Sequence, residues 1–293
     1  DNLKPDMVVT VADRYETLAT AVAAAYLNIP LVHIQGGEVT GSIDEKVRHS
    51  ITKLADLHLV STEESSKRVV RMGEEPDKVI VTGCPSIDLA HEIISNPILD
   101  FDPFVKYGGV GKPVDISDGY LVVMQHPVTT EYNAAGMHVS ETLHAIKDMG
   151  VPTLWFWPNV DAGSDGTSKS MRSFRETEHP LNIHFFKNMA PLDFLRLIYN
   201  CKCLVGNSSV GIRESSFLGI PVVNIGLRQH GRERGFNILD VGYSRTEITT
   251  AITSQIKNGR YDCSEIYGNG KAGLNIANVL AKAPLTIEKR LSY

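Results

Sequence analysis

Short apolar runs alternate with amphipathic helical patterns from the first residues onward. Residues 6–11 have the composition of a strand, and residues 15–27 have the pattern of a helix. The alternation continues with strands expected at 31–35, 57–60 and 79–82, and with helices expected at 43–55, at 63–72 and after Pro85. Strands and helices in strict turn predict parallel strands joined by crossover helices.

The alternation stops between residues 96 and 119 and then starts again. Residues 97–118 carry six Gly and Pro residues, which is typical of a linker. A second series follows, with strands expected at 120–125, 153–157, 183–186, 203–206 and 221–225. We therefore predict an α/β chain of two Rossmann-like domains, the first at residues 1–117 including the linker and the second at residues 118–293. Because the first series begins on a strand that should be internal to its sheet, we expect the first domain to be incomplete on its N-terminal side.

The charge balance argues against a nucleic-acid partner. The chain has 293 residues, with 29 Lys and Arg against 34 Asp and Glu, a formal net charge of −5, and it contains no run of basic residues. Proteins that follow a phosphate backbone carry basic patches. We therefore expect no nucleic-acid partner for this chain.

The apolar residues and cysteines predict neither a membrane span nor a disulfide framework. Residues 17–37 contain no Asp, Glu, Lys or Arg, but Asn28 and Pro30 divide them into a helix and a strand. Four cysteines are too few for a disulfide framework in a chain of this length, and the pair Cys201 and Cys203 does not have the spacing of a zinc site. We expect reduced cysteines, no metal, no membrane partner and a cytoplasmic location.

Polar residues that directly follow the first two strands carry candidate chemistry, because ligands of doubly wound folds bind beyond the carboxyl ends of strands. Asp13 and Arg14 come after the first strand, where Asp13 could equally cap the next helix. Glu38 follows the second strand in a Gly-rich turn, and Asp44 begins the next helix, where a carboxylate also suits the helix dipole. Arg48 and His49 lie about one turn further on, so one of them should share a helix face with Asp44 or Glu45.

Two strands of the second series also end in polar residues. His126 follows the first of them and precedes Pro127. A histidine at this place is often held structurally, but one that faces a cleft is a candidate for catalysis. Asn159 and Asp161 follow the next strand, where they could also simply form a turn.

Residues 206–214 form the most informative segment, which reads Gly-Asn-Ser-Ser-Val-Gly-Ile-Arg-Glu between a strand and a helix. The hydroxyls of Ser208 and Ser209, with backbone donors as far as Gly211, could hold a diphosphate at the helix start. Glu214 could accept hydrogen bonds from ribose hydroxyls. A serine that merely caps the helix is the alternative interpretation.

Basic residues after the next strand favour the phosphate-binding interpretation. Arg228, Arg232 and Arg234 form a cationic group that suits an anionic leaving group. The segment before them lacks the Gly-Lys-Ser/Thr of a P-loop, so it predicts no hydrolysis of nucleoside triphosphates.

Several segments together resemble the hydrolysing UDP-N-acetylglucosamine 2-epimerases of sialic acid and legionaminic acid biosynthesis. They are His-Ile-Gln-Gly-Gly-Glu-Val-Thr-Gly at 33–41, Asp-Glu at 44–45 with Arg-His at 48–49, Gly-Cys-Pro-Ser at 83–86, Gln-His-Pro-Val-Thr-Thr at 125–130, Pro-Asn-Val-Asp-Ala-Gly-Ser at 158–164 and Gly-Asn-Ser-Ser at 206–209. Each segment alone is a weak signal. Their shared order over nearly the whole chain makes the resemblance specific.

The resemblance implies a fold of the glycosyltransferase-B type, with a nucleotide sugar between two Rossmann-like domains, in a homodimer or homotetramer. It implies a UDP-sugar substrate and no cofactor. The implied reaction expels UDP by anti elimination to a 2-acetamidoglucal and then adds water, which gives free N-acetylmannosamine and UDP. Such a reaction needs a carboxylate that takes the C2 proton, an acid on the opposite face, and cations or amides at the leaving diphosphate.

The resemblance also assigns roles to residues of this chain. Asp13 and Asp44 match the acid and base carboxylates, and His126 matches the active-site histidine. The residues at substrate- or nucleotide-binding positions are Arg14, Arg48, Asn159, Asp161, Ser208, Ser209, Gly211, Glu214 and Arg228.

Two features depart from the family pattern. Many members have Glu where this chain has Gln35, and an amide cannot exchange a proton at neutral pH. Either Glu38 takes that role, or Asp13 and Asp44 divide the acid and base steps, or the chemistry differs. Family members also have a further strand and a Gly/Arg turn before the point where this chain starts, so we expect activity of the full-length parent rather than of this chain.

Four alternatives remain open. The first is an epimerase that acts on GDP-N-acetylglucosamine or on a UDP-2,4-diacetamido-6-deoxy sugar, and the second is a non-hydrolysing UDP-N-acetylglucosamine 2-epimerase. The third is a glycosyltransferase of the same fold. The fourth is a non-catalytic protein that binds nucleotide sugars.

Overall fold

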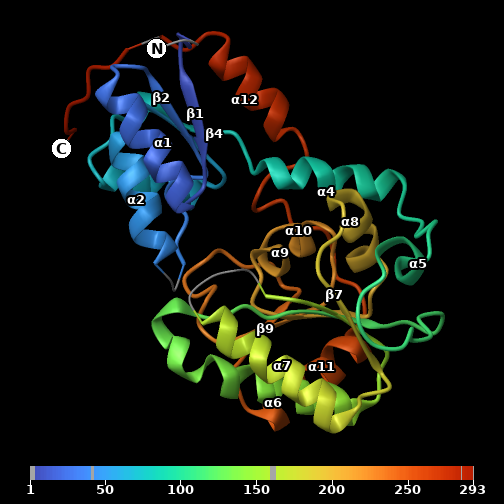
Figure 1. Ribbon diagram of the computed structural model, residues 1–293. Coiled ribbons are helices and arrows are strands. Elements are labelled where there is room, and N and C mark those ends of the chain that lie inside the picture. Colours follow the sequence, from blue (N-terminus) through green and yellow to red (C-terminus); the bar gives the residue numbers. More distant parts are fainter. Residues whose placement is uncertain (1–3, 41–42, 159–162, 285, 293) are drawn as a thin grey trace. The chain divides into compact units, whose positions relative to one another are not determined.

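The computed structural model describes residues 4–40, 43–158, 163–284 and 286–292 (Figure 1). Contacts divide the chain into two compact units, the first formed by Asp1–Asp88 with Ile266–Tyr293 and the second by Leu89–Glu265. Each unit is built on one sheet in which neighbouring strands pair in parallel. The predicted α/β class with parallel sheets is confirmed.

The first unit has a four-stranded sheet in the order β1-β2-β3-β4. Its strands are β1 (Val8–Val11), β2 (Leu31–Ile34), β3 (Leu57–Val60) and β4 (Val79–Val81). The helices that belong to this sheet are α1 (Tyr15–Tyr26), α2 (Asp44–Leu54), α3 (Glu63–Arg71), the short η1 (Pro76–Lys78) and α12 (Ala272–Leu280). Parallel pairing brings the carboxyl ends of the strands to one edge of the sheet, where the loops with the candidate residues begin.

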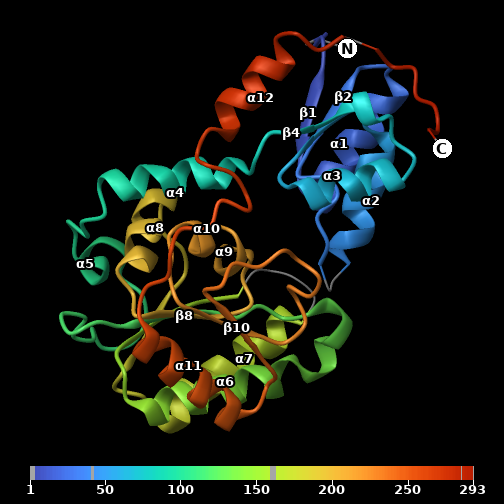
Figure 2. The ribbon, with the colours of Figure 1, turned by 180° about the vertical axis from the view of Figure 1, so that it is seen from behind.

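Helices cover both faces of this sheet. On one face, Leu31 packs against Ala21 of α1 and Ile51 of α2. On the other face, Val32 packs against Ile276 of α12. Because both faces are covered, every residue of β2 is buried, and three of its four residues are apolar. The packing of α12 explains why the C-terminal segment returns to the first unit (Figure 2).

The division into units differs from the predicted boundary after residue 117. The first unit ends at Asp88 and regains residues 266–293, because Asp88 accepts hydrogen bonds from the backbone N–H groups of Ala272 (2.8 Å) and Gly273 (2.6 Å) at the start of α12. A contact across such a separation leaves no local trace in the composition of the chain.

The segment predicted as a linker folds against the second unit. It begins after α4 (Pro85–Ser95) and contains α5 (Pro103–Tyr107). Tyr107 donates a hydrogen bond to Asp193 at 2.5 Å, and Val110 forms an isolated bridge with Phe185. The Gly and Pro residues therefore shape an ordered connection.

The second unit has a six-stranded sheet in the order β10-β9-β8-β5-β6-β7. Its strands are β5 (Leu121–Met124), β6 (Thr153–Phe156), β7 (Ile183–Phe186), β8 (Cys203–Gly206), β9 (Val222–Ile225) and β10 (Ile238–Val241). The first five match the predicted strands. β10 was not predicted, because it lies at the sheet edge, contains Asp240 and is only partly buried.

The helices of the second unit are the short η2 (Thr129–Ala134), α6 (Ala135–Met149), α7 (Ser164–Glu178), α8 (Pro191–Tyr199), α9 (Ser209–Ile212), α10 (Glu214–Phe217) and α11 (Arg245–Asn258). The main core forms where α6, α7 and α11 pack on the sheet, around Leu143, Trp155 and Ile252. No helix in the described part of the chain has the length and apolar composition that a membrane span requires.

A buried carboxylate fastens the C-terminal segment to the first unit. Glu74 is 3% exposed and accepts hydrogen bonds from His58 at 2.9 Å, from Lys53 at 2.5 Å, and from Lys289. Burial alone would raise the pKa of Glu74, but these three donors lower that pKa to about 2. The carboxylate therefore stays ionised and keeps the segment near Lys289 in place.

Candidate functional site

A buried ion pair joins the loops that follow β1 and β2. Arg48 of α2 pairs with Asp13, and its Nη1 also donates a hydrogen bond to the backbone carbonyl of Glu38 at 2.9 Å. The side chain of Arg48 is 1% exposed, whereas that of Asp13 is 19% exposed. Arg48 was expected to contact substrate. In this structure it is buried and pairs with Asp13 at the edge of the sheet, and its contact with substrate stays a prediction.

Asp13 does not cap the helix that follows it. The N-cap residue of α1 is Arg14, whose side chain makes no capping hydrogen bond. The preceding residue, Ala12, has a positive φ of 63°, and its carbonyl oxygen accepts a hydrogen bond from Nε2 of the buried His33 at 2.9 Å. Burial lowers the pKa of His33 to about 4, so this histidine is a neutral donor that fixes the turn before Asp13.

The Gly-rich turn after β2 is packed tightly against its surroundings. Glu38 is 2% exposed, and the Ser61 hydroxyl donates a hydrogen bond to its Oε1 at 3.1 Å. Gln35 has a positive φ of 66° and donates from Nε2 to the Cys84 sulfur at 3.0 Å. A side chain at Gly37 would bring its Cβ within 2.3 Å of the Ser65 carbonyl, so this position requires glycine.

The remaining candidates of the first unit lie at helix starts. Asp44 is the first residue of α2 and is half-buried. Its neighbour Glu45 accepts a hydrogen bond from the backbone N–H of Thr40 at 3.2 Å and pairs with His49 at 3.3 Å. Arg14 is exposed and pairs with Glu16 at 3.2 Å within the first turn of α1. Asp13 and Asp44 are therefore only partly buried, in contrast to Glu38.

An asparagine that we did not predict organises the strand ends of the second unit. The side chain of Asn207 accepts a hydrogen bond from the His126 backbone N–H at 2.7 Å and donates one to the His126 carbonyl at 2.8 Å. The Asn207 carbonyl accepts hydrogen bonds from Gln229 at 2.8 Å and from Arg228 at 3.3 Å. Asn207 thus joins the loops after β5, β8 and β9.

The close approach of β8 to β5 is the signal that could have identified Asn207. The preceding Gly206 has a φ of 130°, and a Cβ there would lie 2.1 Å from the Met124 carbonyl. Only glycine permits this contact, and it brings the next side chain onto the end of β5. The Gly-Asn pair is visible in the sequence, but its partner strand is not.

Ser208 and Ser209 start the short helix α9. The Ser208 hydroxyl accepts a hydrogen bond from the Val210 N–H at 3.4 Å, so this residue is the N-cap. The Ser209 hydroxyl accepts one from Arg213 at 3.1 Å. Gly211 faces the sheet, because a Cβ at this position would lie 3.1 Å from the Val222 side chain. Gly211 therefore serves the packing of α9, while the two serines lie at its start.

Glu214 has a buried carboxylate oxygen without a hydrogen bond in the described part of the chain. It is 6% exposed, its Oε2 lies 3.7 Å from Arg213, and this oxygen makes no hydrogen bond with the described residues. A buried carboxylate oxygen without a donor is costly, which favours a role in accepting hydrogen bonds from a ligand.

His126 is a neutral side chain in this structure. It is 5% exposed, and burial, followed by the charge of Arg228, lowers its pKa to about 3. His126 therefore cannot supply a proton as an imidazolium near neutral pH. It can form a hydrogen bond with a ligand in its neutral form.

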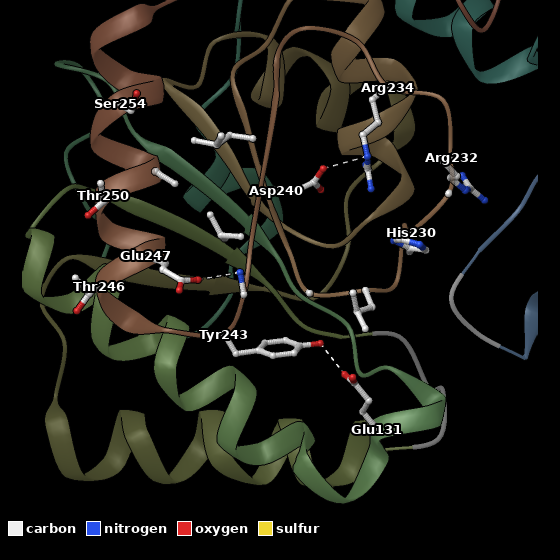
Figure 3. A pocket seen from close by; sticks show the side chains of 17 residues that line it. Glu131, His230, Arg232, Arg234, Asp240, Tyr243, Thr246, Glu247, Thr250 and Ser254 are labelled. Atoms are coloured by element: carbon white, nitrogen blue, oxygen red, sulfur yellow. Dashed lines mark hydrogen bonds and ion pairs between the residues drawn. The ribbon is translucent and has the colours of Figure 1, made fainter.

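The three arginines predicted as one cationic group separate in the structure. Arg228 turns toward Asn207, whereas Arg232 and Arg234 line a cavity of about 1100 Å³ beside β10 and α11 (Figure 3). Arg234 pairs there with Asp240 at 3.1 Å. The residues that line the cavity do not include Ser208, Ser209 or Glu214.

Two predicted residues cannot be placed. Asn159 and Asp161 lie outside the described residues. Within the described ranges, no group of three or more His, Cys, Asp or Glu side chains could hold a metal ion.

The comparisons with known proteins agree on one family. Residues 1–281 match the family model of UDP-N-acetylglucosamine 2-epimerase. The chain is 33% identical over 282 residues to a UDP-N,N'-diacetylbacillosamine 2-epimerase (hydrolyzing) from Legionella pneumophila, a match that covers 96% of this chain and 72% of the relative. It is 30% identical over 270 residues to a UDP-N-acetylglucosamine 2-epimerase from Neisseria meningitidis serogroup B, with 92% of this chain and 68% of the relative covered.

A solved structure has the same fold. The crystal structure of UDP-GlcNAc 2-epimerase from Neisseria meningitidis bound to UDP-GlcNAc superposes with a TM-score of 0.76 at 19% identity, over 96% of this chain and 77% of that chain. This likeness confirms the predicted two-sheet architecture.

The low pKa of His126 predicts its behaviour in solution. The proton NMR signal of its ring should not titrate between pH 5 and pH 8, since its pKa is about 3. In the unfolded chain the ring binds a proton below about pH 6.5. The folded protein should therefore lose stability relative to the His126→Gln variant as the pH falls from about 6.5 toward 3. Loss of the ring signal in His126→Gln assigns that signal to His126. A titration midpoint near pH 6.5 for the signal would contradict the buried, neutral state.

Proposed function

Since the chain belongs to the UDP-N-acetylglucosamine 2-epimerase family, we propose that it is a hydrolysing member, which releases UDP from a UDP-linked 2-acetamido sugar and yields the free sugar epimerised at C2. The observation that carries this proposal is the 33% identity over 282 residues to a relative named as a hydrolysing 2-epimerase. The resemblance of residues 36–41 and 125–130 to the hydrolysing branch supports it.

UDP-N-acetylglucosamine is the first candidate substrate. It is the substrate in the name of the family and of the Neisseria meningitidis relative. UDP-N,N'-diacetylbacillosamine is the second candidate, because the Legionella pneumophila relative is named for it. The two sugars differ at C4 and C6 and share the 2-acetamido group on which the proposed chemistry acts.

The proposed reaction has two balanced steps. In the first, a carboxylate removes the C2 proton while the bond between C1 and the UDP oxygen breaks, and the electron pair of the C2–H bond forms the C1=C2 double bond of the glucal. In the second, the hydroxyl of a water molecule adds to C1, an acid protonates C2 from the opposite face, and the remaining proton of that water restores the acid. The carboxylate that took the C2 proton releases it to solvent and is then ready for the next turnover.

Asp13 and Asp44 are the carboxylates we assign to these proton transfers. The turn fixed by His33 and the ion pair with Arg48 support Asp13, because they hold its carboxylate in one place. The half-buried position of Asp44 at the start of α2 supports the second assignment. Glu38 is the weaker candidate, because it is 2% exposed and accepts a hydrogen bond from Ser61.

The second unit supplies the groups we assign to UDP. The hydroxyls and backbone donors around Ser208 and Ser209, with the charge of Arg228, would stabilise the leaving diphosphate. Glu214 would accept hydrogen bonds from the ribose hydroxyls, which would satisfy its buried Oε2. His126 would contact the ligand in its neutral form.

Product analysis tests the proposed reaction. We expect free N-acetylmannosamine and UDP when the full-length protein is incubated with UDP-N-acetylglucosamine and no acceptor, as measured by anion-exchange chromatography and mass spectrometry. Parallel incubations with UDP-N,N'-diacetylbacillosamine and GDP-N-acetylglucosamine identify the substrate. A nucleotide-linked product would show a non-hydrolysing enzyme. Binding of UDP by the full-length protein with no turnover of any of the three would contradict an enzymatic function.

Substitution of the two aspartates tests their assignment. We expect Asp13→Asn and Asp44→Asn each to lower turnover by about 10²- to 10⁴-fold, because an amide cannot transfer the proton. The dissociation constant of UDP, measured by calorimetry, should change little. Asp118→Asn is the matched control, since Asp118 is exposed in the connection before β5. Loss of UDP binding together with turnover would make the aspartates structural.

A further inference from the structure

The side chain of Tyr243 lies between two loops that carry candidate site residues. Tyr243 follows β10, and its hydroxyl donates a hydrogen bond to Glu131 at 2.8 Å (Figure 3). Glu131 belongs to η2, the turn that directly follows residues 126–128. This contact joins the edge of the sheet to the turn after His126.

The Tyr243 ring is held on one face by α6. It stacks on His138 with 3.5 Å between the ring centroids and an angle of 5° between the planes. His138 Nδ1 lies 3.8 Å from the same carboxylate oxygen of Glu131. The stack and the hydrogen bond together define both the plane of the ring and the position of its hydroxyl.

The other side of the hydroxyl touches the loop of residues 226–234. Gly226 has a positive φ of 75°, and a Cβ at this position would lie only 2.2 Å from the Tyr243 hydroxyl oxygen. Glycine is therefore required for the loop to approach the tyrosine this closely. Arg228 follows two residues later and reaches the Asn207 carbonyl at 3.3 Å.

The Tyr243 hydroxyl is a donor rather than a phenolate. Burial, and then the Glu131 carboxylate, raise the pKa of Tyr243 well above its ordinary value. A hydrogen bond from the backbone N–H of Leu227 lowers this pKa, but its effect is smaller. The hydroxyl thus keeps its proton for Glu131 at any working pH. The same oxygen is close to the backbone of the loop that contains Leu227.

The loop of residues 226–234 has a second anchor at its far end. Arg234 donates to the Gln229 carbonyl at 2.8 Å and pairs with Asp240 of β10 at 3.1 Å. Arg228 lies between this anchor and Gly226. Its position relative to His126 therefore depends on how firmly the Gly226 end of the loop is held.

We propose that Tyr243 is a positioning residue, which fixes the loop that carries Arg228 against the turn that follows His126. The proposal rests on the proposed function, in which Arg228 stabilises the leaving diphosphate and His126 contacts the ligand. Tyr243 does not touch the substrate in this account. It acts through Glu131 on one side and through the Gly226 backbone on the other.

The test removes the hydroxyl and keeps the ring. In Tyr243→Phe the stack on His138 remains, but the hydrogen bond to Glu131 is lost. Hydrogen–deuterium exchange, followed by mass spectrometry, should become faster in the peptides that cover residues 127–135 and 226–234. Exchange in peptides that cover α7 and α11 should not change. This readout does not depend on any substrate.

Kinetics measure the consequence for the proposed reaction. We expect Tyr243→Phe to lower kcat for UDP release on the order of tenfold, because a small displacement of a positioned charge is costly. KM should change less than kcat, since the charge of Arg228 matters most as the diphosphate leaves. Glu131→Gln keeps an acceptor for the hydroxyl and should retain most activity, whereas Glu131→Ala should match Tyr243→Phe. Thr250→Val, on the wall of the same cavity, is the control for a general effect.

A double-mutant cycle separates positioning from stability. If Tyr243 acts through Arg228, the loss of the hydroxyl should have little further effect on kcat in an Arg228→Ala background. Additive losses, or unchanged exchange in both peptides, would overturn the proposal. If the unaltered protein releases no UDP from any nucleotide sugar, the proposed function fails, and the exchange measurement still decides whether Tyr243 holds the two segments.

Discussion

The ion pair between Arg48 and Asp13 is the interaction on which the candidate chemistry of the first unit depends. One buried guanidinium from α2 holds the loop after β1 through Asp13 and the loop after β2 through the carbonyl of Glu38. Removing one partner of a buried ion pair costs about 3–5 kcal/mol, since the other charge stays behind without compensation. Loops that are free to vary in most α/β folds are therefore fixed here, and a carboxylate at their edge keeps one orientation.

In the second unit, the side-chain amide of Asn207 joins the loops at the strand ends. Its side chain forms hydrogen bonds with the backbone of His126, and its backbone carbonyl accepts hydrogen bonds from Gln229 and Arg228. In both units a buried polar side chain joins the loops that carry the candidate residues. Rigid support of this kind is what proton transfer and charge stabilisation require, because misplaced groups lose most of their effect.

The sequence predicts this fold well where the information is local. Buried parallel strands give largely apolar runs, so the sequence predicted β2 and β5, whereas it did not predict the partly polar edge strand β10. The return of α12 to the first unit depends on packing by Ile276, far along the chain from its partners. The site follows the same rule. Asp13 is a candidate because of its place after a strand, but the burial of Arg48 depends on the meeting of two loops, which no local pattern contains.

The central claim is that a carboxylate of this chain removes the C2 proton of a nucleotide sugar while UDP leaves. Proton NMR of the reaction with UDP-N-acetylglucosamine in deuterated water tests it most directly, because the second proton at C2 must come from solvent. The account predicts free N-acetylmannosamine that carries deuterium at C2, together with released UDP. A product that retains the original C2 proton, or one that stays linked to UDP, would contradict it.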